Sequence, residues 1–193
     1  FGNGTIRIQG ETLQKKNSRQ FKQSVGFVFQ NPDDQLFMPT VYEDVAFGPQ
    51  NLGWDKARVD AAVKEALKAV ELKGYQEKSS HHLSSGEKKR VAIATVLAMN
   101  PRVLVLDEPS TNLDPHARRQ LINLIRSMEI TTIIAGHDLE MILELCERAL
   151  IVDGGRTVGG GVPEHLFRDS HLMESHLLEV PYSLRGSVQS KVL

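Results

Sequence analysis

The sequence lacks several features that would assign it to whole classes of proteins. It has one cysteine, Cys146, in 193 residues, which excludes a disulfide framework and fits a cytosolic setting. A lone cysteine in a helix-like stretch is more typical of a small apolar core residue than of a nucleophile. No apolar run approaches the roughly 20 residues that a membrane-spanning helix needs, and no signal peptide is visible. We therefore expect any work at a membrane to depend on a partner.

An excess of charge of one sign is also missing. The formal net charge is -1, so nothing indicates a general electrostatic attraction to nucleic acid. The length suits one domain with a small appendage, and the 40% hydrophobic and 24% charged shares are ordinary for a globular protein. The sequence opens on Phe1 and enters a strand-like pattern at once, so we expect an N-terminal portion to precede it.

The stretch around which the rest is organised runs from Val103 to Pro109 and reads V-L-V-L-D-E-P. A short unbroken apolar run is typical of a strand buried on both faces of a parallel sheet. Ligands of open α/β sheets bind at the carboxyl ends of strands, which is where Asp107 and Glu108 follow. Two adjacent acids there suit a Mg²⁺-nucleotide site, with one acid for the metal and one for an attacking water. The alternative is an ordinary core strand that ends in a polar turn.

Strand-like and helix-like segments alternate along the chain, which predicts an α/β fold with a mostly parallel sheet. Thr40 and Glu43 have the spacing of a capping box, Pro49, Gly53 and Trp54 predict a break, and Asp114 with Pro115 predicts the start of another helix. We expect 17–23 to lie at the surface and the tail to have weak periodicity. The predicted strands are 4–8, 25–29, 103–106, 131–135, 149–152 and 157–158, and the predicted helices are 40–48, 55–73, 88–99, 115–127, 139–147 and 163–169.

Polar residues follow three of the predicted strands, where they can meet at one sheet edge: Gln30, then Asp107 with Glu108, then His137. A strand-end histidine is more often structural, and a glutamine after a strand is usually part of a loop. Together, however, they supply what nucleotide hydrolysis needs. Asp107 would hold Mg²⁺ directly or through water, and Glu108 would act as general base. His137 would contact the γ-phosphate, and Gln30 would reach the metal or the water.

A second candidate site is the segment from Ser84 to Gly86, which opens the predicted helix 88–99. Small residues at a helix N-terminus form a seat for an anion, and a glycine lets the backbone approach phosphate closely. Lys88, Lys89 and Arg90 crowd the first turn of this helix. Cations there oppose the helix dipole unless an anion offsets them.

Several motifs together resemble the ATP-binding subunit of ABC transporters. In chain order, L-S-S-G-E-K-K-R-V-A-I-A resembles the signature motif, V-L-V-L-D-E-P-S-T-N-L-D-P the Walker B strand, catalytic glutamate and D-loop, and I-I-A-G-H-D the switch histidine. Q-N-P-D-D-Q-L-F resembles the Q-loop. The sequence of this segment, together with T-V-Y-E-D-V-A-F-G-P-Q-N-L-G after it, is similar to that of the ATPases of cobalt, nickel and energy-coupling-factor vitamin importers. The resemblance covers roughly residues 4–167.

The resemblance implies a P-loop NTPase-like ABC ATPase core. Its α/β fold has a mostly parallel sheet and a helical signature subdomain at about 40–98, inside an ATPase domain spanning 1–169. Residues 170–193 would be a C-terminal tail. ATP and Mg²⁺ are the implied ligands, sandwiched between two ATPase subunits in a homodimer or heterodimer. The implied nucleotide-binding residues are Ser84, Ser85, Gly86, Glu87 and Asp114, with Ser84 and Gly86 touching the γ-phosphate held by the other subunit and Asp114 crossing the dimer seam.

The family also implies a partner and a location. Transmembrane permease subunits would dock through the Q-loop region, at the cytoplasmic face of the cell membrane, with no role for nucleic acid. Leu36, Phe37 and Met38 fit a groove for a coupling helix of the permease, although burial in the core of the domain is an equal alternative.

The chain departs from the family pattern in two places. It contains no G-x-x-x-x-G-K-[ST] motif, and no glycine is followed by lysine. Without this loop no lysine reaches the β/γ-phosphates, so we expect the chain as given to bind ATP poorly and to be inactive, with the loop preceding Phe1 in the intact protein. Ser85 stands where glycine is usual, and Glu87 where glutamine is common.

Two other functions compete with an importer ATPase. A non-transport ABC ATPase acting on DNA or the ribosome would carry long coiled-coil or linker insertions near the signature, which this sequence lacks. An inert fragment or regulatory partner is supported by the missing P-loop alone.

Overall fold

The structure, a computed structural model, describes residues 4–8 and 10–185 of the chain. The chain forms two compact units, Phe1–Gly136 and His137–Leu193. Among the described residues, the first unit contains a three-stranded and a two-stranded sheet, and the second unit contains a two-stranded sheet.

A parallel sheet in the order β3-β4-β5 organises the first unit. Its register pairs Val28 with Leu106 and Asp107 with Ala135, so the three strands end at the same edge. The predicted α/β fold with a parallel sheet is therefore confirmed. The strands are β3 (Val25–Val28), β4 (Val103–Asp107) and β5 (Thr131–Ala135).

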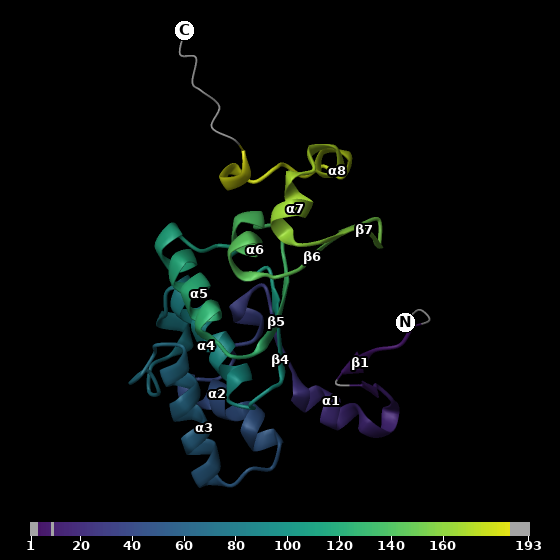
Figure 1. The fold of residues 1–193 in the computed structure, drawn as a ribbon. Coiled ribbons are helices and arrows are strands. Elements are labelled where there is room, and N and C mark those ends of the chain that lie inside the picture. Colours follow the sequence, from purple (N-terminus) through teal and green to yellow (C-terminus); the bar gives the residue numbers. More distant parts are fainter. Residues whose placement is uncertain (1–3, 9, 186–193) are drawn as a thin grey trace. The chain divides into compact units, whose positions relative to one another are not determined.

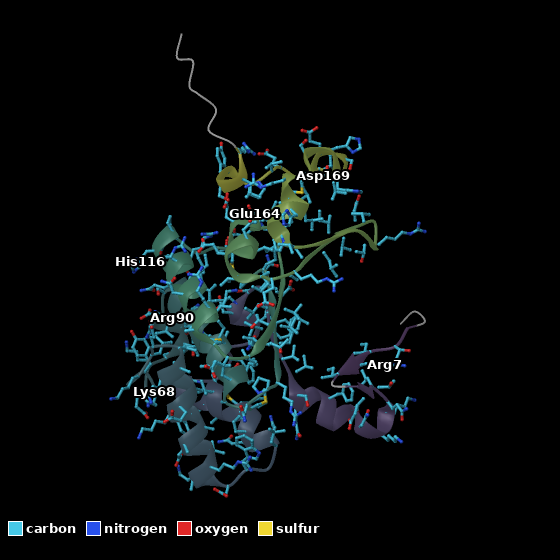
Figure 2. The ribbon with its side chains drawn as sticks, viewed as in Figure 1. Arg7, Lys68, Arg90, His116, Glu164 and Asp169 are labelled. Atoms are coloured by element: carbon cyan, nitrogen blue, oxygen red, sulfur yellow. The ribbon has the colours of Figure 1, made fainter. Side chains whose placement is uncertain are left out.

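Helices cover one side of this sheet. Figure 1 shows α2, α3, α4 and α5 gathered on the same side of β4 and β5. The side chains of Lys68 and His116 lie on the outer side of this helical layer (Figure 2) and are exposed. The helical elements of the first unit are η1 (Lys15–Asn17), α1 (Ser18–Ser24), η2 (Pro32–Asp34), α2 (Val41–Asn51), α3 (Lys56–Ala69), η3 (Ser80–His82), α4 (Ser85–Leu97) and α5 (Pro115–Ser127).

The two faces of the sheet differ in burial. Leu104 and Leu106 are fully buried on the face that α4 packs against. On the other face Phe27 is 43% and Ile133 54% exposed, while Val105 between them is half-buried. Successive side chains of a strand point to opposite faces, and the helices of this unit cover one of them. The prediction that β4 is buried on both faces is therefore wrong for the chain as described.

Local signals located the helix starts better than the helix ends. Thr40 and Glu43 form the predicted capping box, and Asp114 accepts the capping hydrogen bond of α5. The break predicted from Pro49, Gly53 and Trp54 is confirmed, but it begins after Asn51, where α2 ends, and not at Pro49. A proline this close to the end of a helix removes one intrahelical hydrogen bond and leaves the preceding turns intact. The helix predicted for 55–73 ends at Ala69.

The N-terminal part of the first unit differs from the prediction. Of the strand predicted at 4–8, Arg7–Ile8 form β1, which pairs antiparallel with β2 (Glu11–Thr12). The segment predicted as surface at 17–23 is largely the helix α1. Because this segment is mostly polar, it has no apolar periodicity from which the helix could be predicted.

The second unit packs helices on a β-hairpin. Its elements are α6 (Leu139–Leu145), β6 (Ala149–Asp153), β7 (Arg156–Gly161), α7 (Pro163–Arg168), α8 (Ser170–Ser175) and η4 (Tyr182–Leu184). Its core consists of Ala149, Ile151, Leu166, Phe167 and Met173. Because Met173 lies on α8, the predicted tail contributes to this core, and a functional boundary at residue 169 stays a prediction. Among residues 4–8 and 10–185, no helix has the length and apolar character needed to cross a membrane.

Candidate nucleotide-hydrolysis site

The carboxyl edge of the parallel sheet carries three of the predicted site residues. Asp107 is the last residue of β4 and pairs with Ala135 of β5. Glu108 follows it, and Gln30 follows the neighbouring strand β3 as an exposed residue. Since β3 and β4 are parallel and in register, Gln30 and the two acids leave the same edge, as the sequence predicts.

Glu108 has an unusual backbone conformation. Its φ of 43° lies in the left-handed region, which costs a non-glycine residue about 1 kcal/mol or more. Two backbone hydrogen bonds hold it there, from Glu108 N–H to the Ala135 carbonyl at 2.8 Å and from Thr111 N–H to the Glu108 carbonyl at 3.2 Å. A Cβ on Gly136 would lie 3.4 Å from Glu108 Oε2. The turn therefore places this carboxylate against the backbone that follows β5.

His137 is the first residue of the second unit, directly after Gly136. Its carbonyl accepts a hydrogen bond from Leu139 N–H at 3.0 Å. Next to it, Asp138 caps α6 by accepting from Met141 N–H at 3.0 Å. The meeting of His137 with the γ-phosphate beside Glu108 stays a prediction.

The donor chemistry of the sheet edge fits a metal that is shared with a nucleotide. Among the described residues, no group of three or more His, Cys, Asp or Glu side chains could hold a metal ion. Mg²⁺ is commonly bound through one or two carboxylates together with nucleotide phosphates. Asp107 offers such a carboxylate, and Gln30 offers an amide oxygen. Mg²⁺ bound there would supply charge stabilisation to the transferring phosphoryl group.

The signature segment begins α4 with a complete capping box. Ser84 Oγ donates to Glu87 Oε2 at 2.9 Å, and Ser84 N–H donates to the same oxygen at 2.8 Å. The other carboxylate oxygen accepts from Tyr75 Oη–H at 2.7 Å. These bonds from Tyr75 and Ser84 lower the pKa of Glu87. The negative charge of Glu87 is thus engaged by donors of its own chain, while Ser84 and Ser85 are exposed.

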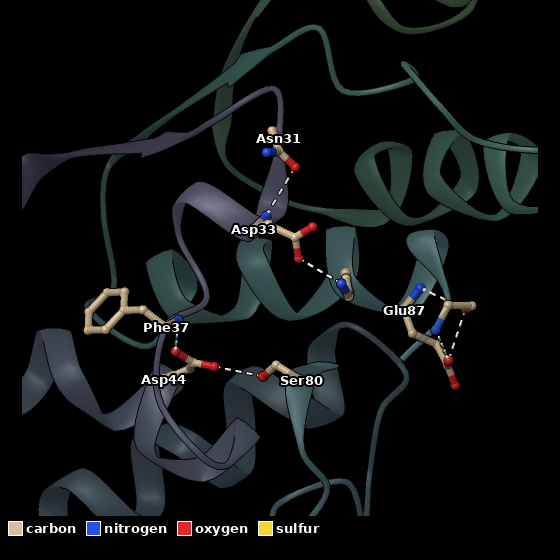
Figure 3. Close-up of polar contacts among 8 residues, drawn as sticks. Asn31, Asp33, Phe37, Asp44, Ser80 and Glu87 are labelled. Atoms are coloured by element: carbon tan, nitrogen blue, oxygen red, sulfur yellow. Dashed lines mark hydrogen bonds and ion pairs between the residues drawn. The ribbon is translucent and has the colours of Figure 1, made fainter. Parts of the chain in front are cut away.

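The cations predicted to oppose the dipole of α4 have partners in the loop after β3. Lys88 Nζ lies 2.7 Å from Asp33 Oδ1 of η2 (Figure 3). Lys89 Nζ donates to the Gln30 carbonyl at 2.6 Å. The offsetting negative groups therefore come from the Q-loop segment, in addition to any bound anion.

Lys89 is a residue whose role sequence reasoning missed. Its side chain is 1% exposed, and burial lowers its pKa while the charge of Asp107 acts in the opposite direction. The ammonium group therefore lies inside the unit, between the Q-loop and the acidic end of β4. A usable signal was its helical spacing, because Lys89 precedes the buried Ala92 and Ile93 by three and four residues.

Gly86 has a packing role besides its predicted approach to phosphate. A Cβ at Gly86 would lie 2.9 Å from Ala117 Cβ on α5, so the glycine allows α4 and α5 to approach closely.

Replacing Gly86 by alanine in the full-length protein should lower the free energy of unfolding by about 1 kcal/mol, because overpacking costs more than the gain in helix propensity. Urea denaturation measures this. The cost of Gly86→Ala should fall by more than half when it is measured in an Ala117→Gly background, because the clashing methyl group is then absent. An equal cost in both backgrounds would show that the helix approach does not explain the glycine.

Comparisons with known proteins agree with this fold. Residues 2–111 match the family model described as "ABC transporter". SCO3161 of Streptomyces coelicolor, whose name describes an ABC transporter ATP-binding protein, is 49% identical over 181 residues, 94% of this chain and 70% of that protein. The energy-coupling factor transporter ATP-binding protein EcfA of Methanococcus maripaludis is 44% identical over 93% of this chain and 66% of its own length.

A solved structure gives the same result. The structure of cbiO1 from Clostridium perfringens, described as part of the ABC transporter complex cbiONQ, superimposes with a TM-score of 0.79 and 35% identity, over 90% of this chain and 71% of that one. The chain therefore belongs to the ABC transporter family and has the fold of its ATP-binding subunits. The resemblance read from the motifs is confirmed.

Proposed function

We propose that the full-length protein hydrolyses ATP to power the import of cobalt or nickel ions, or of a vitamin, through a membrane transporter. The observation that carries this proposal is the sheet edge where Asp107 and Glu108 leave β4 beside the Q-loop segment. Relatives named for energy-coupling factor transport and for a cbiONQ complex support the importer type. The missing phosphate-binding loop makes the chain as given a poor ATPase on its own.

The proposed roles divide between two subunits. Within one subunit Asp107 binds Mg²⁺ with Gln30, Glu108 takes a proton from the attacking water, and His137 contacts the γ-phosphate. Ser84 to Glu87 and Asp114 act on the nucleotide of the second ATPase subunit. In support, Ser84 is exposed at the start of a helix of 13 residues, where backbone N–H groups and the helix dipole favour an anion.

The permease is proposed to dock on an aromatic patch beside the Q-loop, made of Phe37 and Phe47. Their rings pack edge to face at 5.1 Å and are 57% and 40% exposed. Leu36 belongs to the core of the unit instead, at 4% exposure. Asp33 and Asp34 lie nearby in η2 and are exposed. Cytoplasmic loops of membrane proteins carry an excess of Lys and Arg, so an apolar and basic permease segment suits this patch at the cytoplasmic face.

Transport by reconstituted vesicles tests the proposal. The full-length protein is purified with the membrane proteins encoded beside its gene and placed in liposomes that enclose ATP, so that the ATPase subunits of the active transporters face the lumen. We expect ATP-dependent uptake of labelled cobalt, nickel or one vitamin, and no uptake without the membrane proteins. Hydrolysis stimulated by DNA or ribosomes, with no uptake, would support the non-transport alternative. Absence of hydrolysis in the full-length protein would support an inert regulatory subunit.

A further inference from the structure

A buried carboxylate joins three segments of the first unit that are distant in sequence. Asp44 of α2 is 3% exposed. Its Oδ1 accepts from the N–H groups of Phe37 and Met38, both at 2.9 Å, and its Oδ2 accepts from Ser80 Oγ at 2.7 Å. Figure 3 shows the bonds from Phe37 and Ser80. Burying a charge is costly unless it is well hydrogen-bonded, and bonds to a charged acceptor are roughly twice as strong as neutral ones. The carboxylate of Asp44 therefore holds these three segments together strongly.

One end of this connection is the aromatic patch. Asp44 accepts a hydrogen bond from the backbone of Phe37. The ring of Phe37 packs against Phe47, which lies on α2 three residues after Asp44. Any force that a partner applies to the patch therefore reaches α2 both through the ring contact and through the carboxylate.

The other end is the signature segment. Ser80 is 2% exposed and begins η3, and Ser84 caps α4 four residues later. The first turn of α2 also makes two backbone hydrogen bonds to the residues just before Ser80. Val41 N–H donates to the Lys78 carbonyl and Tyr42 N–H to the Gln76 carbonyl, each at 2.9 Å. The start of α2 and the segment 76–84 are thus fixed to each other just before the serine that is proposed to touch ATP.

The Q-loop segment is attached to α4 by separate contacts. Gln35 Nε2 donates to the Ala92 carbonyl and to Thr95 Oγ1, both at 2.8 Å. These bonds reach the middle of α4, and Lys88 reaches Asp33 from its first turn. The bond from Asp44 to Ser80 differs from them because it acts on the chain that leads into Ser84.

We propose that Asp44 is a positioning residue that transmits movement of the permease from the aromatic patch through Ser80 to the signature serine, Ser84. This inference rests on the proposed function and adds the route by which the permease controls hydrolysis. Ser80→Ala removes the bond from Ser80 Oγ to Asp44 and leaves in place the two bonds that Asp44 accepts from Phe37 and Met38.

The test compares ATP hydrolysis by the full-length protein with and without the permease in the same liposome preparation. The ratio of the two rates should fall about five-fold in Ser80→Ala, the effect of losing roughly 1 kcal/mol of hydrogen bonding. Asp44→Ala should lose at least as much. Asp44→Asn should retain most of the ratio, because its oxygen can accept from the loop while its amide donates to Ser80 Oγ. Ser79→Ala is the matched control, since Ser79 makes no capping bond to η3, and its ratio should equal that of the wild type.

Melting temperatures of all variants identify any that fail to fold. Ser80→Ala with a wild-type melting temperature and a wild-type ratio would overturn the route through Ser80 and leave the proposed function intact. The route through Ser80 would also be overturned if the ratio of the two rates fell as far in Ser79→Ala as in Ser80→Ala. If the wild-type rate does not respond to the permease at all, the proposed function fails and the route fails with it.

Discussion

Replacing Glu108 by glutamine in the full-length protein should lower steady-state ATP hydrolysis about 100-fold or more, the usual contribution of a general base. Glutamine has the shape of glutamate but cannot accept the proton of the attacking water. The backbone bonds that hold Glu108 at φ 43° do not involve its side chain, so the fold should tolerate the change. ATP should still bind, and the ATP-bound dimer should accumulate. Phosphate release and size-exclusion chromatography with ATP measure these two outcomes.

The matched control for this variant is Glu65→Gln on the exposed surface of α3, where the Glu65 side chain is 69% exposed and lies 3.8 Å from Lys68. The same chemical change there should leave hydrolysis within about two-fold, since an isolated surface ion pair contributes little. Near-normal turnover by folded Glu108→Gln would refute the assignment of the base. A slow variant that also fails to form the ATP-bound dimer would place Glu108 in binding instead.

Features set by neighbours in the sequence were predictable. The apolar run before Asp107 predicts β4, and the spacing of Thr40 and Glu43 predicts the start of α2. Each of these signals is contained within a few neighbouring residues. The parallel order of the strands also follows from their alternation with helices. The edge where Gln30 and Glu108 leave the sheet therefore follows from the sequence alone.

Features set by contacts between distant segments were not predictable from local patterns. The burial of Lys89 depends on the Gln30 carbonyl 59 residues away, and Asp44 meets Ser80 across 36 residues. Charged residues usually lie at the surface, and of these two residues only Lys89 has a local hint of burial, its helical spacing to Ala92 and Ile93. Local patterns therefore place both at the surface. The exposed face of the sheet at Phe27 was missed for the opposite reason, because an apolar run does not reveal which of its faces is covered.

These distant contacts change how the signature segment is understood. In the sequence, Lys88 and Lys89 lie near the start of α4, where their charges oppose the helix dipole unless an anion offsets them. A bound phosphate is the obvious candidate for that anion. In the structure Asp33 and the Gln30 carbonyl already take that place. Lys88 and Lys89 therefore hold the Q-loop, while Ser84 and Ser85 are exposed. The Q-loop and the start of α4 are thus in direct contact within one subunit.

Replacing Gly26 by alanine in the full-length protein should lower its free energy of unfolding by about 2–3 kcal/mol, the upper range for overpacking a core. Gly26 lies in β3 opposite Leu104, and a Cβ there would lie 2.0 Å from Val96 Cγ1 of α4 and 3.2 Å from Pro101 Cγ. Val96 is 3% exposed, so its side chain has little room to move away. Either the strand or the helix must shift, and urea denaturation at constant temperature measures the cost.

The matched variant is the double substitution Gly26→Ala with Val96→Ala, which removes the clashing methyl group while nearly conserving the volume of the pair. Although Val96→Ala alone should destabilise the protein by about 1–2 kcal/mol through the cavity it leaves, the double variant should be more stable than Gly26→Ala alone. Because β3 leads directly into Gln30, Gly26→Ala should also slow ATP hydrolysis, and the double variant should recover part of the rate. If the double variant is no more stable than Gly26→Ala, then the contact with Val96 does not account for the glycine, and the close packing of β3 on α4 does not position the Q-loop.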